Sequence, residues 1–460
     1  MSLILLGVPL AVVVPLVLFC GLVSAWSQGR WSNAWAAAVM PGVLVVTAAP
    51  FPSESAPFVV GVVFALATAA AWAGVLPAPT SVLVSNAVGS GVVVGVALAT
   101  SRFVADLAPL AAPVVMALVI SGSEVLGSRA SPFGEWGSLA HTQVRRRWAL
   151  AIARRGPHVV TAALVLVSSA FGFAFVQRSA PLLGLALAAA AGLAVAGYGY
   201  ALTGRAGSAG LRVAGVLEDD ELFFAAHVGH FVATTAVSDE WWSSFGASSS
   251  YQQRLLLERT RAAGVEGADL VVWAEGAGLV AVADHDRALE ATAAIARSTS
   301  TYIVASWMVL DRGLGRGGGT MDNVCTVFDA SGEIVLTTAK RFPVPGPEAD
   351  RTTVRSQGDL QAVETPFGGL AVRICFDADH AECWRQIARS GADVVAVPAS
   401  DWPAIGPLHA DMARLRARSV AAAIVRPARS GVSIIATPRG GVIARQDHRD
   451  RNAPALRGTL

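Results

Sequence analysis

Two patterns of hydrophobic positions divide the chain into halves. In the first half, apolar runs recur at about the 20 residues that an α-helix needs to cross the hydrocarbon core of a bilayer. The first run has no basic segment before it and is followed by further runs, so it predicts a membrane helix rather than a cleaved signal peptide. The pattern predicts a polytopic α-helical membrane domain over residues 1–205, with about seven helices near 3–23, 33–50, 57–76, 80–100, 103–121, 158–177 and 181–201.

The pattern changes after Arg212, where short runs of β-branched residues begin to alternate with segments of helical period. Such an order is typical of one α/β domain built from layers of sheet and helix, which we place at residues 215–455. Strands are predicted at 226–234, 269–274, 301–309, 323–329, 333–339, 368–376, 392–398, 431–437 and 441–446. Helices are predicted at 250–264, 285–298, 379–391 and 407–425.

Composition supports this division and excludes several classes of protein. The 460 residues are 53% hydrophobic and 15% charged, and residues 1–100 contain only two charged side chains, Arg30 and Glu54. The low charge excludes a disordered chain, and a net charge of only +2 excludes a nucleic-acid-binding protein. Four cysteines are too few for a disulfide-stapled secreted domain.

The connector before the predicted helix at 158–177 carries two kinds of signal. Its aromatic, glycine-rich stretch Pro132–Leu139 fits either an interfacial anchor or a loop that guides a lipid substrate. Its positive charge favours the cytoplasmic face, whereas an odd number of helices puts the two ends of the membrane domain on opposite faces. Membrane sidedness therefore stays open from charge alone, given the arginines at positions 145, 146, 147, 154 and 155.

The chain contains a single lysine, Lys340, among 35 basic residues. A chain that uses arginine at every other basic position keeps lysine where a compact ammonium has to fit a tight pocket and respond to burial. Taken alone, this lysine could equally be a chance surface residue.

Two further residues mark the ends of predicted strands. Glu275 ends an apolar run that begins at Ala268, and Cys375 ends another that begins at Leu370. Strand ends are favoured places for catalytic groups in α/β folds, and helix-terminal N–H groups nearby stabilise a thiolate. A buried thiol is the commoner fate of a single cysteine, but a carboxylate, the only lysine and a cysteine at strand ends together indicate a catalytic site.

The remaining cysteines are interpreted as structural. Cys325 lies within a predicted strand and Cys383 on the predicted helix at 379–391. No paired-cysteine or HExxH spacing is present, so the sequence predicts no metal site.

Glutamate, lysine and cysteine in this chain order resemble the nitrilase (carbon–nitrogen hydrolase) superfamily. With the membrane half attached, residues 1–455 resemble the bacterial apolipoprotein N-acyltransferases. The matching segments are Trp273-Ala274-Glu275, Lys340 with Glu348 eight positions on, Ile374-Cys375-Phe376-Asp377, Ser400-Asp401-Trp402 with Gly406–His409, and the aromatic connector Pro132–Gln143.

The resemblance implies an αββα sandwich and a mechanism through a covalent thioester. Cys375 would be the nucleophile and Glu275 the general base. Lys340 and the backbone N–H of Phe376 would stabilise the oxyanion, and Glu348 would hold Lys340 charged and oriented.

The resemblance also implies partners and a location. The acyl donor would be a phospholipid and the acceptor the amine of a diacylglyceryl-cysteine lipoprotein. No cofactor, metal or nucleic acid is implied, and the protein would be a monomer in the bacterial inner membrane with its catalytic domain on the extracytoplasmic face. Phe133 and Trp136 would line the lipid access, and Trp402 and Asp377 would be accessory residues.

The sequence departs from the family in three places. Ala274 stands where the family has proline before the first glutamate, Asp377 stands where it has glutamate, and no apolar run of spanning length follows the α/β domain. Two alternatives therefore stay open: a membrane-tethered amidase, or a degenerate homologue that binds lipids or lipoproteins. A transporter is disfavoured because the spans contain almost no ionisable residue, Asp106 being the main exception.

Overall fold

The structure is a computed structural model. The chain folds into two compact units, a helical unit of residues 1–131 and 135–203 and an α/β unit of residues 132–134 and 204–460. The predicted strand at 226–234 and the predicted helices at 3–23 and 181–201 lie outside the described residues, apart from 189–190 and 192. The structure describes residues 34–49, 52, 54–72, 80–131, 133–176, 189–190, 192, 210–217, 238–311, 320–345, 348, 360, 362–447 and 455–460.

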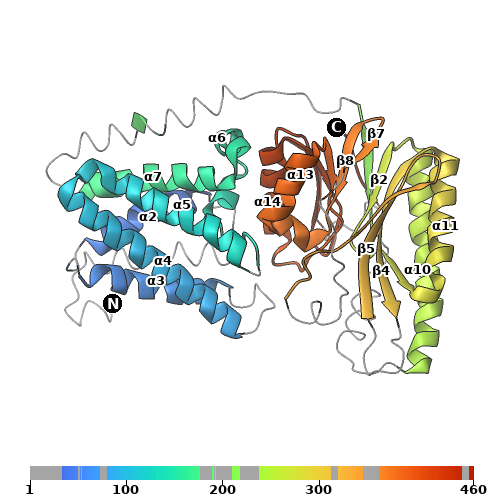
Figure 1. Ribbon diagram of the computed structural model, residues 1–460, viewed down its shortest axis with the longest axis horizontal. Coiled ribbons are helices and arrows are strands. Elements are labelled where there is room, and N and C mark those ends of the chain that lie inside the picture. The colour runs from blue at the N-terminus through green and yellow to red at the C-terminus, as the bar shows by residue number, and fades with distance from the viewer. Residues whose placement is uncertain are drawn as a thin grey trace. The chain divides into compact units, whose positions relative to one another are not determined.

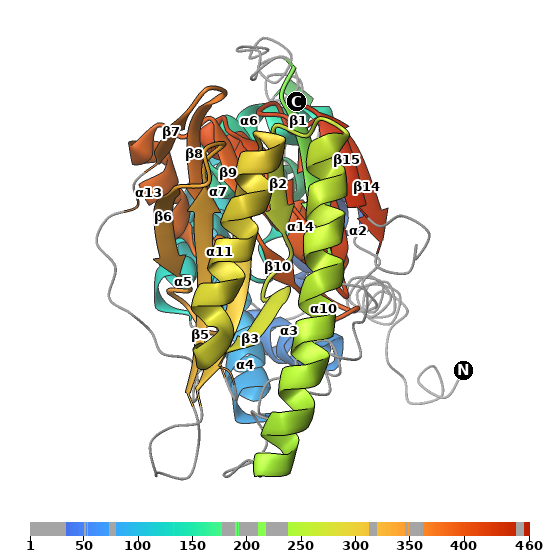
Figure 2. The same ribbon diagram turned by 90° about the vertical axis from the view of Figure 1, so that its right-hand side faces the viewer.

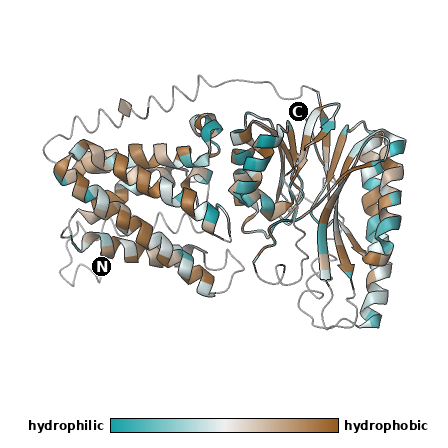
Figure 3. Ribbon diagram, viewed as in Figure 1, coloured by the Kyte–Doolittle hydropathy of each residue, from teal (hydrophilic) through white to brown (hydrophobic). Residues whose placement is uncertain are grey.

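The described part of the helical unit consists mainly of apolar helices (Figures 1 and 3). Three helical stretches, Thr80–Leu107, Pro109–Ala130 and Pro157–Val176, are long and apolar enough to cross a membrane. The helices are α2 (Ala34–Ala48), α3 (Ala56–Trp72), α4 (Thr80–Leu107), α5 (Ala112–Ala130), α6 (Arg147–Ile152) and α7 (Pro157–Val176), with single 3-10 turns at η2 (Pro109–Ala111), η3 (Leu139–Gln143) and η4 (Ala153–Arg155).

The boundary between the predicted helices at 80–100 and 103–121 was wrong. Helix α4 continues through Leu107, and the chain breaks at Ala108, directly before Pro109. Proline has no N–H to donate within a helix and its ring clashes with the preceding turn, so the break falls at the proline rather than at the polar Ser101-Arg102 pair.

Glycines let α3 and α4 pack closely. A Cβ added to Gly61 would lie 2.8 Å from the carbonyl oxygen of Gly91, and one added to Gly95 would lie 3.0 Å from that of Pro57. Small residues at four-residue spacing allow such backbone contact, which is how helices commonly associate in apolar surroundings.

The α/β unit contains two main sheets packed face to face (Figures 1 and 2). The first has the order β15-β1-β2-β4-β5-β6, with β3 paired to β4, and the second has the order β14-β13-β11-β9-β8-β7. The first sheet comprises β1 (Arg212–Val216), β2 (Leu270–Trp273), β3 (Gly278–Ala281), β4 (Tyr302–Asp311), β5 (Thr320–Phe328), β6 (Ile334–Ala339) and β15 (Ala455–Thr459). The second comprises β7 (Val363–Thr365), β8 (Gly368–Val372), β9 (Val394–Ala396), β11 (Ala423–Arg426), β13 (Val432–Ala436) and β14 (Val442–Asp447), and β10 (Ala399–Ser400) pairs separately with β12 (Ala428–Arg429).

Helices cover the outer face of each sheet. Helices α10 (Asp239–Val265) and α11 (Val282–Thr299) pack on the first sheet, and α13 (Ala381–Ser390) and α14 (Gly406–Val420) on the second. The central core draws residues from both sheets, including Val272, Val304, Val372 and Val425. This arrangement confirms the predicted αββα sandwich.

Most predicted elements of this unit are present, and the differences have local causes. The helix predicted at 407–425 was wrong at its end, because Ala421 takes a left-handed conformation with φ of 59° and the chain then enters β11. The strand predicted at 368–376 ends at Val372, after which η5 (Cys375–Asp379) begins. Strands β1, β3, β7, β10, β11, β12 and β15 were not predicted, because they are short and several contain glycine or alanine.

Candidate active site

Glu275, Lys340 and Cys375 each lie directly beyond a strand of the sandwich. Glu275 follows β2, Lys340 follows β6, and Cys375 begins η5 just after β8. All three are buried, with exposed fractions of 3%, 1% and 5%. The backbone N–H of Glu275 donates to the carbonyl of Ala399 at 3.2 Å, which joins the segment after β2 to the short strand β10.

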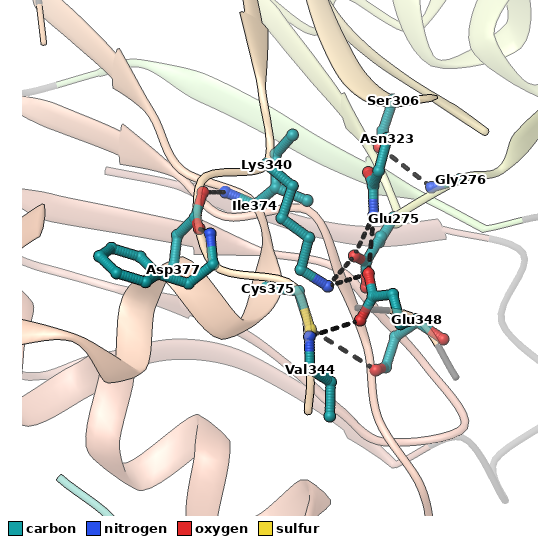
Figure 4. Close-up of polar contacts among 12 residues, drawn as sticks. Glu275, Gly276, Ser306, Asn323, Lys340, Val344, Glu348, Ile374, Cys375 and Asp377 are labelled. Atoms are coloured by element: carbon teal, nitrogen blue, oxygen red, sulfur yellow. Dashed lines mark hydrogen bonds and ion pairs between the residues drawn. The ribbon is translucent and has the colours of Figure 1, made fainter. Parts of the chain in front are cut away.

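Lys340 lies between two carboxylates (Figure 4). Its Nζ is 2.9 Å from Oε1 of Glu275 and 2.6 Å from Oε1 of Glu348. Oε2 of Glu348 accepts from the backbone N–H of Val344 at 2.9 Å, which fixes the loop after Lys340 around the ammonium. The predicted pairing of Lys340 with Glu348 is therefore present in the geometry.

The charge of Lys340 is stabilised by these neighbours. Burial lowers the pKa of its ammonium, but the charges of Glu275 and Glu348 outweigh burial and raise the pKa well above its usual value. Lys340 is therefore a cation at any physiological pH, and it is held rigidly at the edge of the site.

Cys375 occupies a strained position next to this cluster. Its φ is +47°, a left-handed conformation that costs a non-glycine residue free energy, and its N–H donates to the carbonyl of Pro398 at 2.7 Å. Burial raises the pKa of the thiol well above its usual value, the charge of Glu275 raises it further, and Lys340 opposes this. The resting group is a neutral thiol, so nucleophilic attack requires a base to accept its proton.

Asp377 ties the cysteine turn to the lysine loop. Its Oδ1 accepts from the backbone N–H groups of Arg341 at 3.0 Å and Phe342 at 2.8 Å, and its Oδ2 accepts from that of Ile374 at 3.3 Å. Burial raises the pKa of this carboxyl to about 6, although the hydrogen bond from Phe342 and the charge of Lys340 oppose the shift.

The segment after β10 forms a buried charge network beside the cysteine turn. Asp401 accepts from Nδ1 of His409 at 2.9 Å and from Nη2 of Arg426 at 2.7 Å, and Nε2 of His409 is 3.2 Å from Asp379. Burial opposes the charge of Asp401, but Arg426 and His409 lower its pKa to about 2. The ring of Trp402, a predicted accessory residue, lies 5.9 Å from that of His409, so Trp402 packs beside this network.

The predicted lipid-access residues lie in the turn after α5. Phe133 falls within the short segment that groups with the α/β unit, and Trp136 falls within the helical unit. Both side chains are half-buried, and their role in lipid access stays a prediction.

Sequence reasoning missed two residues that contact Glu275. Asn323 on β5 donates from Nδ2 to Oε1 of Glu275 at 2.7 Å, and Arg429 donates from Nη2 to the carbonyl oxygen of Glu275 at 2.7 Å. Asn323 lies on the same face of β5 as Cys325 and Val327, which face the central core. A polar residue at an inward-facing strand position is the signal that could have identified it.

Among the described residues, no group of three or more His, Cys, Asp or Glu side chains is arranged to hold a metal ion. The cluster can instead supply a thiol, a base next to it, and a fixed cation. These are the parts needed to form and break a covalent acyl–sulfur bond.

Comparison with known proteins assigns the α/β unit to a family. The carbon-nitrogen hydrolase family pattern matches residues 238–452. A hydrolase of Schizosaccharomyces pombe is 29% identical over 177 residues, covering 35% of this chain and 53% of the relative. An omega-amidase of Danio rerio is 28% identical over 145 residues, covering 28% of this chain and 52% of the relative. The chain thus spans about half the length of these curated relatives.

A similarity to solved structures was also found. An amidase from Nesterenkonia sp. is 17% identical, with a TM-score of 0.42, over 55% of this chain and 91% of that chain. Because the family pattern matches residues 238–452, the C-terminal part of the chain contains a carbon–nitrogen hydrolase domain of the nitrilase superfamily. Its homologues include amidases.

Proposed function

We propose that the protein is an acyltransferase that carries a fatty acyl group from a phospholipid, through a Cys375 thioester, to the N-terminal amine of a diacylglyceryl-cysteine lipoprotein. The observation that carries the covalent chemistry is the buried cluster of Lys340 between Glu275 and Glu348, beside a strained cysteine. In this proposal the enzyme is a multi-pass monomer of the bacterial inner membrane with its catalytic domain on the extracytoplasmic face.

In the first half-reaction, Cys375 Sγ attacks the ester carbonyl and Glu275 takes the thiol proton. The oxyanion is stabilised by Lys340 and by the backbone N–H of Phe376. The ester C–O bond then breaks, and the proton returns from Glu275 to the departing lysophospholipid oxygen. Lys340 and Asn323 both donate to Oε1 of Glu275, so Oε2 is the oxygen that takes and returns the proton.

In the second half-reaction, the acceptor amine attacks the thioester and Glu275 takes one of its protons. The C–S bond breaks, an amide forms, and the proton passes from Glu275 to the sulfur, which restores the starting thiol. Burial favours this last step, because it raises the pKa of the Cys375 thiol.

The helical unit supports transfer to a lipid substrate rather than to water. Three of its helical stretches are long and apolar enough to cross a membrane, and α4 exposes a stripe of large apolar side chains at four-residue spacing. These are Val84, Val88, Val92 and Val96, each between 48% and 59% exposed. An exposed apolar stripe of this kind fits contact with lipid chains.

A second candidate is an amidase, favoured by the similarity to omega-amidases. The same cysteine, base and cation would then hydrolyse a small amide through the same thioester. The third alternative, a degenerate binding protein, is disfavoured by the intact contacts of Glu275, Lys340 and Glu348.

The test is incubation of the full chain with labelled phospholipid and a diacylated lipopeptide, followed by mass analysis of the peptide. Transfer predicts a lipopeptide heavier by one acyl chain. A matched control is Cys383→Ala, which removes another buried thiol of the same domain and should leave transfer intact. Release of ammonia from a small primary amide, without acylated lipopeptide, would favour the amidase instead.

A further inference from the structure

Among the residues that the structure describes, Asn323 has a partner for its amide nitrogen and none for its amide oxygen. The side chain is 1% exposed. Nδ2 donates to Glu275 Oε1 at 2.7 Å and approaches Glu348 Oε1 at 3.4 Å. Oδ1, in contrast, is buried and has no hydrogen-bond partner among the described residues. A buried carbonyl oxygen without a donor is costly, so this oxygen is suited to accept a hydrogen bond from a substrate donor.

The orientation of the amide follows from its neighbours. If the side chain were flipped, Oδ1 would face the oxygens of Glu275 and Glu348, which are both acceptors. The nitrogen must therefore face the carboxylates. Figure 4 shows the amide nitrogen turned toward Glu275, and because Nδ2 and Oδ1 share one carbon atom, the unpaired acceptor lies one amide group away from the base.

We infer that Asn323 is a specificity-determining residue whose Oδ1 accepts the second N–H of a primary amine nitrogen at the acyl carbon. This inference rests on the thioester chemistry proposed above. A primary amine that attacks the thioester carries two hydrogens. One goes to Glu275 as the base, and the other is available to Asn323. A secondary amine has only one hydrogen and leaves Asn323 Oδ1 unpaired.

Asn323 Oδ1 and Glu275 would play the same parts in acyl transfer and in amide hydrolysis. In acyl transfer the nitrogen enters carrying two hydrogens. In amide hydrolysis the –NH2 group carries two hydrogens on the acyl carbon, gains the proton held by Glu275, and leaves as ammonia when the C–N bond breaks. The chemical class recognised is thus a nitrogen bearing two hydrogens, and it includes both the lipoprotein N-terminus and a primary carboxamide.

The test measures a ratio of products in one tube. Glycinamide and its N-methyl analogue sarcosinamide compete for acyl groups from dioctanoyl phosphatidylglycerol. Removal of a buried hydrogen-bond partner changes such selectivity by about tenfold. We expect Asn323→Leu to lower the ratio of glycinamide to sarcosinamide product by that factor. We expect Asn323→Gln, which keeps both an amide donor and an amide oxygen acceptor, to retain more of the ratio than Asn323→Leu does.

A second arm compares hydrolysis of butyramide with hydrolysis of N-methylbutyramide, and the same shift is expected there. The matched control is Ser306→Ala, because the Ser306 hydroxyl accepts from the N–H of Gly276 at 3.0 Å, close to the base, without facing the carboxylates. The ratio does not depend on how much protein is folded. An unchanged ratio in Asn323→Leu, with acyl-enzyme still formed, would overturn the inference alone. Absence of acyl-enzyme and turnover in both arms of the wild type would overturn the proposed function as well.

Discussion

The carboxylate of Asp377 accepts a hydrogen bond from the backbone N–H of Phe342 at 2.8 Å. This contact joins the turn that holds the cysteine to the loop that follows the lysine. Aspartate stands here where the acyltransferases that the sequence resembles have glutamate, and its side chain reaches the lysine loop. The aspartate therefore links the cysteine turn to the lysine loop.

Asp377→Asn should lower the turnover number by about 10- to 100-fold, because an amide replaces a charged acceptor of three backbone N–H groups. Burial raises the pKa of Asp377 to about 6, so its carboxylate is protonated as the pH falls through that value. Wild-type activity should fall correspondingly. The pH profile of Asp377→Asn should lack this fall in activity. The same fall in both proteins would show that another group titrates there.

Lys340→Arg should lower the turnover number by about 100- to 1,000-fold, the usual effect of losing an oxyanion donor. The bulkier guanidinium cannot occupy the space between Glu275 and Glu348 with the geometry of an ammonium. The matched control is Arg341→Lys, at a half-buried neighbour that pairs with Glu382. Steady-state kinetics of the two variants should differ by at least tenfold. Equal effects would show that Lys340 acts only as a structural cation.

His409 should make the fold sensitive to alkaline pH. Burial lowers the pKa of its imidazole, but the charges of Asp379 and Asp401 raise it to about 9, from an ordinary value of 6.5. Because the pKa of His409 is higher in the folded than in the unfolded chain, its protonation stabilises the fold. This stabilisation is complete below pH 6.5 and is lost as the pH rises through about 9.

The groups that face His409 are Asp379, Asp401 and, through Asp401, Arg426. In melting curves between pH 6.5 and 9.5, the wild type should lose melting temperature with rising pH. His409→Asn should have a lower melting temperature at pH 6.5 and lose less of it as the pH rises. Parallel slopes for the two proteins would contradict the assignment.

Helix packing in the helical unit should depend on Gly91. A Cβ there would collide with the carbonyl of Gly61 on the neighbouring helix, so Gly91→Ala should lower stability by about 1–3 kcal/mol. Gly89 lies two residues earlier on the same helix and has nothing within 4 Å of an added Cβ. Gly89→Ala is therefore the control and should leave the melting temperature in detergent unchanged or raised. Equal effects of the two variants would refute this packing.

Much of the α/β domain could be predicted from the sequence because its core strands are long apolar runs. Glu275 and Cys375 were found because each ends such a run. The lysine was identified because it is the only one in the chain. Strands such as β1 and β15 were missed, because their pairing is made by residues far apart in the chain, such as Arg212 with Thr459. No local pattern encodes that contact.

Contacts between side chains could not be predicted in the same way. Asn323 is one polar residue within a strand, and its role depends on the distance of its amide from Glu275. Asp377 looked like a weakness of the site because its chain is one methylene shorter than expected. Its three backbone hydrogen bonds are visible only when the lysine loop is folded against it.

The most direct test of the central claim is peptide mapping of the protein after incubation with labelled phospholipid and no acceptor. We expect an acyl group on the peptide that contains Cys375, released by hydroxylamine as a thioester is, and absent from Cys375→Ala. An acyl adduct that persists in Cys375→Ala, or that maps to another residue of the domain, would contradict it.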